Sequence, residues 1–231
     1  MSDNNNTFSI AIDGPAGAGK TAIARALAKE LGAIHLDTGA MYRAAGLFMF
    51  REDVVKDPAA VARRVEDVDI TLRFLDGEQH IYLSGEDVTQ SIRDLRVSMA
   101  TMRISGIPQV REHMMALQRK IADGQNVVME GRDIGTRVLP NATLKIYLTA
   151  SIEERARRRY KQMKEADFPV KYDQVLKDIM ERDDQDAHRA VSPLRPAEDS
   201  VHIDSSNMTF DETVALIKRL AMEAIHRNNT P

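Results

Sequence analysis

Short apolar runs alternate with helical patterns along most of the chain. Glycine or polar residues bound these runs, and each run is too short for a helix but long enough for a buried strand. Because strands that alternate with helices form βαβ crossovers, the pattern predicts an α/β fold with a parallel sheet flanked by helices. The five expected strands are residues 8–12, 34–36, 126–129, 143–149 and 201–203. The clearest helical patterns are residues 20–31, 41–50, 151–164 and 209–226.

One stretch departs from this rhythm. Residues 69–75 and 80–84 alternate apolar and polar positions on either side of Asp76-Gly77-Glu78-Gln79. Alternation on both sides of a turn sequence is typical of an antiparallel hairpin. We therefore expect an inserted subdomain at about residues 57–111, which carries this hairpin.

Composition narrows the class of protein. The 231 residues are 43% hydrophobic and 29% charged, as in ordinary globular proteins, and the net charge of −3 gives no attraction for nucleic acid. The absence of cysteine excludes disulfides, thiolate zinc sites and cysteine nucleophiles. Met1–Thr7 lacks the pattern of a signal sequence, and no apolar run approaches ~18 residues. We expect a cytoplasmic protein with neither nucleic acid nor membrane as a partner.

A glycine-rich motif between the first strand and the first helix carries the strongest chemical signal. It fits G-x-x-x-x-G-K-[ST], in which backbone N–H groups and the helix N-terminus face phosphate oxygens. Lys20 is expected to bridge the β- and γ-phosphates, and Thr21 is expected to bind Mg²⁺. The predicted nucleotide-binding residues are Gly14, Pro15, Ala16, Gly17, Ala18, Gly19, Lys20, Thr21 and Ala22. The motif alone does not distinguish a kinase from an ATPase or a GTPase.

Arginine positions indicate where a transferred phosphoryl group would be held, since a planar guanidinium grips two oxygens at once. Arg132 and Asp133 directly follow an apolar strand, at the sheet edge where ligands bind in open α/β folds. A loop-stabilising ion pair between these two is the alternative. Arg182, Asp186 and Arg189 share one face if their helix continues, either as a ligand site or as an ion-paired surface.

Together these motifs resemble bacterial cytidylate kinases, members of the nucleoside monophosphate kinase group, over nearly the whole chain. The resemblance rests on the glycine loop, Leu36–Arg43, Pro108–Arg111, Glu130–Thr136 and the segment from Glu181 to Leu194. It implies transfer of phosphate from ATP to CMP and dCMP, giving CDP and dCDP, with Mg²⁺. It also implies a single domain, 1–231, with a P-loop core (7–56, 112–154 and 190–231), a monophosphate-binding insertion (57–111) and a lid (155–189).

The resemblance also implies residue roles. Asp186 would contact the sugar, Arg182 and Asp133 the base or ribose, and Arg43 and Arg132 the phosphate. The implied substrate-binding set is Thr38, Arg43, Arg111, Arg132, Asp133, Arg182, Asp186 and Arg189. The implied catalytic set is Lys20, Arg132, Arg158 and Arg182. Arg155, Arg158 and Arg159 would lie on a short mobile lid over ATP, although a solvated surface is the alternative for residues 155–159.

One position departs from the family pattern. Where relatives often have a serine that contacts the base, this chain has Met102. Thr101 or Ser105 could compensate. Because cytosine and uracil differ in an amino donor and a carbonyl acceptor, selectivity between them depends on such polar groups.

The acceptor phosphate needs no general base, since its second pKa near ~6 leaves it mostly a dianion at neutral pH. A shikimate kinase is the enzymatic alternative, with Asp37 or Asp133 as a base, but such compact kinases lack the long insertion. A GTPase switch is the alternative from another class, and the sequence has no Asn-Lys-x-Asp segment to read guanine. Without a coiled-coil pattern, we expect a monomer.

Overall fold

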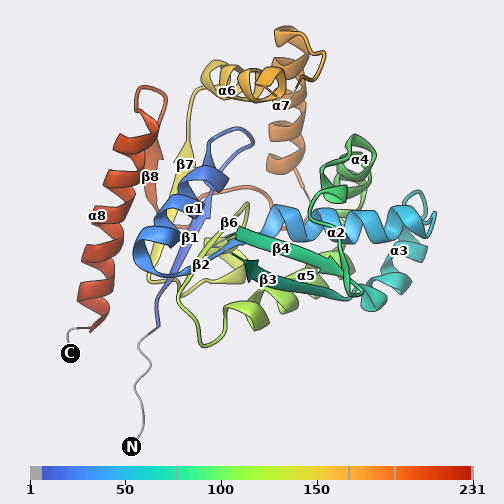
Figure 1. The fold of residues 1–231 in the computed structure, drawn as a ribbon, viewed down its shortest axis with the longest axis horizontal. Coiled ribbons are helices and arrows are strands. Elements are labelled where there is room, and N and C mark those ends of the chain that lie inside the picture. Colours follow the sequence, from blue (N-terminus) through green and yellow to red (C-terminus); the bar gives the residue numbers. More distant parts are fainter. Residues whose placement is uncertain (1–6, 76–77, 166, 190, 230–231) are drawn as a thin grey trace, which may run out of the picture.

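The sheet at the centre of the molecule joins strands that lie far apart in the sequence. The structure, a computed structural model, describes residues 7–75, 78–165, 167–189 and 191–229. Five parallel strands lie in the order β2-β6-β1-β7-β8 (Figure 1). They are β1 (Ser9–Asp13), β2 (Ile34–Asp37), β6 (Val127–Gly131), β7 (Leu144–Thr149) and β8 (Val201–Asp204). The five predicted strands and the α/β fold class are thereby confirmed, whereas Met1–Asn6 of the polar start lies outside the described residues.

Side-chain alternation on β1 places one hydrophobic core on each face of the sheet. Ile10 and Ile12 pack into one core, and Ala11 between them packs into the other. This follows from the two-residue period of a strand. Helices α1 (Lys20–Leu31) and α8 (Phe210–Asn229) contribute to the first core, and α2 (Thr38–Arg51) and α5 (Pro108–Ala122) to the second. The predicted helix at 41–50 is longer than expected because the Asp37 carboxylate caps α2 by accepting the Ala40 N–H at 2.8 Å.

Between α2 and α5 the chain forms a smaller layer with its own sheet. Strands β3 and β4 pair antiparallel, which confirms the predicted hairpin. The predicted turn is wrong in its second half because Glu78 and Gln79 already belong to β4, while Asp76 and Gly77 lie outside the described residues. The elements are α3 (Pro58–Arg64), η1 (Val65–Asp67), β3 (Ile70–Leu75), β4 (Glu78–Leu83), β5 (Glu86–Asp87), η2 (Ser91–Arg93) and α4 (Leu95–Ile104). Ile70, Ile81 and Leu83 pack into the same core as Ala11, so this layer is continuous with the sheet.

Two helices project at the top of Figure 1 and pack against each other. They are α6 (Ile152–Glu165) and α7 (Tyr172–Ala187). Their contact is a small apolar core of Ala156, Val175 and Ile179, separate from the two cores on the sheet. A remaining element, η3 (Ile134–Val138), is a single π-helical turn after β6. Among the described residues, no helix is long and apolar enough to cross a membrane.

Candidate functional site

The loop after β1 leaves backbone N–H groups free at the start of α1. Gly14, Gly17 and Gly19 have φ angles of 152°, 76° and 91°, which residues with a Cβ rarely adopt. At Gly14 a Cβ would lie 1.9 Å from the carbonyl oxygen of Leu148, so the loop passes directly against β7. Gly19 is the N-cap of α1 and no side chain caps this helix. The first turn is therefore an anion site, made by free N–H groups and the helix dipole.

Lys20 is the buried cation of this loop. Its Nζ donates to the carbonyl oxygens of Gly14 and Pro15, both at 2.8 Å. Burial, together with the positive charges of Arg132 and Arg182, lowers the pKa of Lys20 to about 7. A negatively charged ligand beside Lys20 would stabilise the ammonium form. All nine predicted nucleotide-binding residues lie on this loop and the first turn of α1.

A buried carboxylate lies next to the predicted metal-binding residue. Glu130 is the second-last residue of β6, and its side chain hydrogen-bonds with the Thr21 hydroxyl. Burial tends to raise the pKa of Glu130, but His35, Lys20 and Thr21 together lower it. The His35 Nε2 to Glu130 Oε1 distance of 3.9 Å is too long for a hydrogen bond, so we attribute the lowering mainly to Lys20 and Thr21. Sequence reasoning gave Glu130 no role, although an acid at the end of an apolar strand was a visible signal.

Ion pairs from four separate segments meet beyond this loop. Arg132 Nε donates to Asp186 Oδ2 at 2.7 Å, and Arg111 Nη2 donates to Asp133 Oδ2 at 2.5 Å. Arg132 and Asp133 thus each pair with a distant partner. The alternative prediction, a loop-stabilising ion pair between these two residues, is wrong. Three further contacts complete the group: Arg43 to Asp37 at 3.3 Å, Arg189 to Asp186 at 3.6 Å, and the Thr38 hydroxyl to the Glu130 carbonyl oxygen at 2.7 Å.

Arg182 lies among these arginines with its side chain exposed. Although the residue has a large accessible surface, desolvation of its guanidinium by the many neighbouring atoms and the nearby charge of Arg132 lower its pKa to about 10, while Asp186 opposes the shift. The helix does not continue to Arg189, because α7 ends at Ala187. The condition for a common helical face therefore holds for Arg182 and Asp186, which lie one turn apart on α7, but not for Arg189, which contacts Asp186 from beyond the end of the helix. An accessible arginine that is crowded by other cations is a strong anion ligand.

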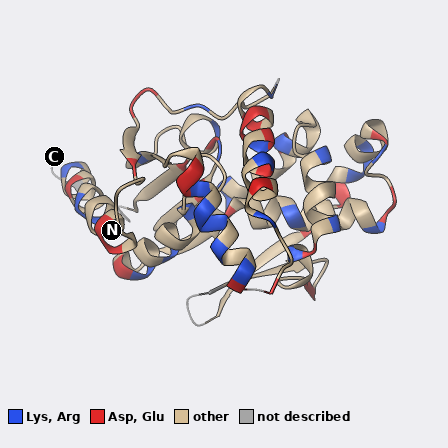
Figure 2. Ribbon diagram, turned by 90° about the horizontal axis from the view of Figure 1, so that it is seen from above, with Lys and Arg blue, Asp and Glu red and all other residues tan. Residues whose placement is uncertain are grey.

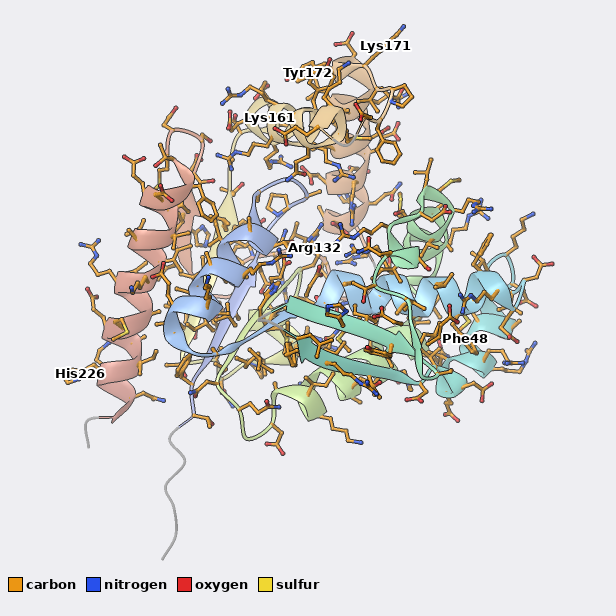
Figure 3. All side chains as sticks on the ribbon, in the orientation of Figure 1. Phe48, Arg132, Lys161, Lys171, Tyr172 and His226 are labelled. Atoms are coloured by element: carbon orange, nitrogen blue, oxygen red, sulfur yellow. The ribbon has the colours of Figure 1, made fainter. Side chains whose placement is uncertain are left out.

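Several donors in the cluster keep free hydrogen-bonding capacity. Within the described residues, the buried Nε atoms of Arg111 and Arg189 have no hydrogen-bond acceptor. In Figure 3 Arg132 lies in the middle of the molecule, below the α6–α7 pair that carries the labels of Lys161 and Tyr172. Figure 2 looks down on this end of the molecule and shows basic positions gathered near its middle. The cluster can therefore accept further anionic groups.

The predicted lid arginines differ in their surroundings. Arg155 is buried and donates to the carbonyl oxygens of Ala150 and Ala16, and to Asp183 at 2.5 Å. Arg158 donates to the backbone oxygen of Ser205 at 2.7 Å and to Glu154 at 2.8 Å. These contacts join α6 to the glycine loop and to the end of β8. Arg159 is exposed, and the solvated alternative for this cluster fits Arg157 and Arg159 but not Arg155.

The position that departs from the family pattern lies on α4. The Met102 side chain is 47% exposed, so it is not part of a core. Thr101 faces α2, because its hydroxyl lies only 2.4 Å from where a Cβ on Gly46 would be. The same hydroxyl donates to the Val97 carbonyl oxygen within α4. The backbone carbonyl oxygen of Ser105 accepts Arg111 Nη1 at 3.1 Å, while its hydroxyl donates to the Met102 carbonyl oxygen at 3.3 Å. The end of α4 is thus tied to the arginine cluster.

Comparison with known proteins identifies the family. The family model for cytidylate kinase matches residues 10–223. A cytidylate kinase of Caldanaerobacter subterraneus subsp. tengcongensis is 48% identical over 225 residues, which is 97% of each chain. One from Caldicellulosiruptor bescii is 45% identical over 219 residues, covering 94% of this chain and 97% of the relative.

A solved structure of an uncharacterized protein from Eubacterium ventriosum shares the fold alone. Its TM-score is 0.53 at 12% sequence identity, and the match covers 94% of this chain and 99% of that one. The match to the family model runs from β1 into α8 and includes the glycine loop, Glu130 and the arginine cluster, and the two cytidylate kinases are 48% and 45% identical to this chain. The chain therefore belongs to the cytidylate kinase family.

Proposed function

We propose that this protein transfers the γ-phosphoryl group of ATP to the phosphate of CMP or dCMP, giving CDP or dCDP. One observation carries the proposal: a chain of this family places six basic side chains around its glycine loop and the ends of β2 and β6. These are Lys20, Arg43, Arg111, Arg132, Arg182 and Arg189. Two phosphorylated substrates that meet end to end need such a density of positive charge.

The glycine loop would hold ATP. The free N–H groups of the first turn of α1 suit its phosphates, and Lys20 needs only to leave the carbonyl oxygens of Gly14 and Pro15 to reach them. The Thr21 hydroxyl fits a Mg²⁺ ion, which takes few protein ligands alongside phosphate oxygens and water. When bound, Mg²⁺ supplies positive charge to the phosphate oxygens. Glu130 beside Thr21 would orient that hydroxyl.

The arginine cluster would hold the monophosphate. Arg43 and Arg132 are assigned to its phosphate, Asp186 to its sugar, and Arg182 with Asp133 to the base or ribose. The free Nε–H groups of Arg111 and Arg189 and the buried Thr38 complete the set. The carboxylates hold the arginines in place through the ion pairs described above, which favours a fixed geometry of the donors.

Catalysis then rests on alignment and charge. The acceptor phosphate is mostly a dianion at neutral pH, so no base has to remove a proton from it. Asp37 and Asp133, the candidate bases of a hydroxyl kinase, are instead engaged with Arg43 and Arg111. Lys20, Arg132, Arg158 and Arg182 would stabilise the charge that spreads over the migrating group.

We further propose that residues 57–111 form the monophosphate-binding insertion and residues 155–189 the lid of a monomeric enzyme that works in the cytoplasm. The separate small core of α6 and α7 supports movement of the lid as a unit. The buried contacts of Arg155 hold the start of the lid against the glycine loop. Closure would therefore move Arg159 more than Arg155, and would exclude water from the site.

A substrate panel tests the proposed function. Production of ADP is measured with CMP, dCMP, UMP, AMP and shikimate as acceptors, and with no acceptor. We expect the highest kcat/KM with CMP or dCMP. Preference for shikimate would contradict a phosphate acceptor, and ATP or GTP turnover that needs no acceptor would contradict a transferase.

Proton uptake provides a prediction for Lys20. Because its pKa is about 7, Lys20 is mostly neutral at pH 8, and a bound phosphate would return it to the ammonium form. Binding of a non-hydrolysable ATP analogue should therefore take up as much as about one proton at pH 8, and affinity should fall as pH rises above 7. Calorimetry in two buffers of different ionisation enthalpy measures this uptake. The Lys20→Met variant is the control, and an equal uptake in both proteins would contradict the assignment.

Met102 provides a prediction for base selectivity. Met102→Ser should raise the ratio of kcat/KM for CMP over UMP by roughly fivefold to tenfold, the value of one hydrogen bond to the cytosine amino group. Met99→Ser is the matched control, since Met99 is likewise exposed on α4, one turn earlier. An unchanged ratio in Met102→Ser would show that this position lies outside the base pocket.

A further inference from the structure

Asp13 ends β1 immediately before the glycine loop, and it is almost completely buried. Its carboxylate accepts two backbone N–H groups from across the sheet. Oδ1 accepts from Ile134 at 2.8 Å and Oδ2 accepts from Gly135 at 2.7 Å. These amides lie 121 and 122 residues away in sequence. Sequence reasoning gave Asp13 no role.

The two amides open the π-helical turn that follows Arg132 and Asp133. The first N–H groups of a helical turn have no partner within the turn, and no side chain within η3 caps it. Asp13 satisfies both from the neighbouring strand, where it lies in register with Gly131. Gly135 packs closely here, since a Cβ at this position would lie 3.4 Å from Asp13 Oδ2 and 3.2 Å from the Lys145 side chain.

The attachment of the turn by Asp13 affects the two residues that precede it, Arg132 and Asp133. Arg132 reaches Asp186 from this segment, and Asp133 reaches Arg111. The segment is held at β6 on one side and at η3 on the other, so loss of the Asp13 contacts loosens the backbone that carries both side chains.

We propose that Asp13 is a positioning residue, whose carboxylate fixes the turn after β6 and so places Arg132 and Asp133 opposite the glycine loop. The attachment of the turn by Asp13 does not depend on which reaction the enzyme catalyses. The expected effect of Asp13 on the kinetics rests on the proposed function. Asp13 touches neither substrate in this proposal, and it acts through the backbone that carries the two ligands.

The ionisation of Asp13 makes its hydrogen bonds to the Ile134 and Gly135 amides depend on pH. Burial raises its pKa to about 6, the two amides oppose the shift, the Asp133 carboxylate adds to it and Lys20 lowers it. The other titratable groups around it are Tyr147 and Lys145, whose ammonium pairs with Asp199. A protonated oxygen is a weaker acceptor than a carboxylate oxygen, so the hydrogen bond to one amide weakens below about pH 6.

Protonation should loosen this attachment without unfolding the protein. The pKa of Asp13 is higher in the folded state than its ordinary value of 3.8, so the folded state binds the proton more tightly. Its contribution to stability is therefore largest at low pH and falls as pH rises through about 6. Asp13→Asn removes a buried charge as well as one acceptor oxygen, so the fold should persist.

Amide resonances test the attachment of the turn in the ligand-free protein. Two-dimensional ¹⁵N NMR between pH 5 and 8 should show the Ile134 and Gly135 amide shifts titrating together with a midpoint near pH 6, and no such step in Asp13→Asn. This result does not depend on which substrate the enzyme uses. Absence of a common step in the wild-type protein would overturn the proposal, even if the variant failed to fold.

Steady-state kinetics test the positioning role. Asp13→Asn should lower kcat/KM for CMP by roughly tenfold or more while KM for ATP changes by less than about threefold, since the loss is confined to the arginine segment. Asp211→Asn is the control, because Asp211 is exposed in the first turn of α8 and loses the same charge. An equal rise in both KM values, or unchanged kcat/KM for CMP, would overturn the positioning role.

Discussion

Replacing Lys20 with alanine should lower kcat by roughly two to three orders of magnitude. Lys20 is the one cation on the glycine loop itself, and removal of a single preorganised donor to developing charge commonly costs about 2.7–4 kcal/mol of transition-state stabilisation. Burial first, and the nearby charges of Arg132 and Arg182 second, lower the pKa of Lys20, so an anion bound beside it would stabilise its charged form. The measurement is kcat with CMP at saturating ATP.

The fold should survive this change. Lys20 is buried, and alanine removes a buried ammonium along with two hydrogen bonds to Gly14 and Pro15 that are worth about 1 kcal/mol each. Lys29→Ala, at the last turn of α1, is the matched control and should retain full activity. If Lys20→Ala turned over CMP at a near-normal rate while its melting temperature stayed unchanged, Lys20 would not be the phosphate ligand.

Replacing Arg132 with alanine should lower kcat/KM for CMP by roughly 100-fold. A charge-assisted hydrogen bond to phosphate is worth about 1.5–3 kcal/mol, and the change also frees Asp186 to repel the acceptor. Loss of Arg132 should raise the pKa of Asp186, because burial already raises it and Arg132 is the leading opposing charge. KM for ATP should change much less than KM for CMP.

Two further variants separate charge from geometry at this position. Arg132→Lys keeps the charge but not the planar pair of donors, so it should recover only part of the loss. Arg137→Ala, exposed on η3 five residues later, is the control for general disturbance of this segment. A kcat/KM for CMP within threefold of wild type in Arg132→Ala would contradict its place in the monophosphate site.

The helices and strands were predicted from local sequence patterns. The apolar runs on β1, β6 and β7 and the alternation on β3 and β4 are fixed by which face each residue must bury. The pattern did not reveal β5, because two residues are too few to show alternation. It also placed Glu78 and Gln79 in a turn, although the Gln79 side chain accepts the Asp37 N–H at 2.9 Å and thereby joins β4 to the end of β2.

The candidate site likewise has one part that was predictable from a local motif and another part whose contacts only the structure reveals. The glycine loop was predictable because its chemistry lies within nine consecutive residues. Arg132 and Arg182 were candidates from their positions in the sequence. The family resemblance then assigned them, together with Arg111, to the monophosphate, and the structure shows where each lies. Arg155 illustrates the limit: the family resemblance implied a place on a mobile lid, but its contacts with Ala16 and Asp183 come from segments 139 and 28 residues away.

The sequence by itself determined that this chain forms a parallel α/β sheet with a phosphate-binding loop, since strand periodicity and loop chemistry are local properties. The tertiary structure alone decided which charges face each other. Arg132 meets Asp186 across 54 positions, and Asp13 meets Ile134 across 121. Such pairs depend on the strand order β2-β6-β1-β7-β8, which brings the ends of β1 and β6 side by side and which no single strand's pattern encodes.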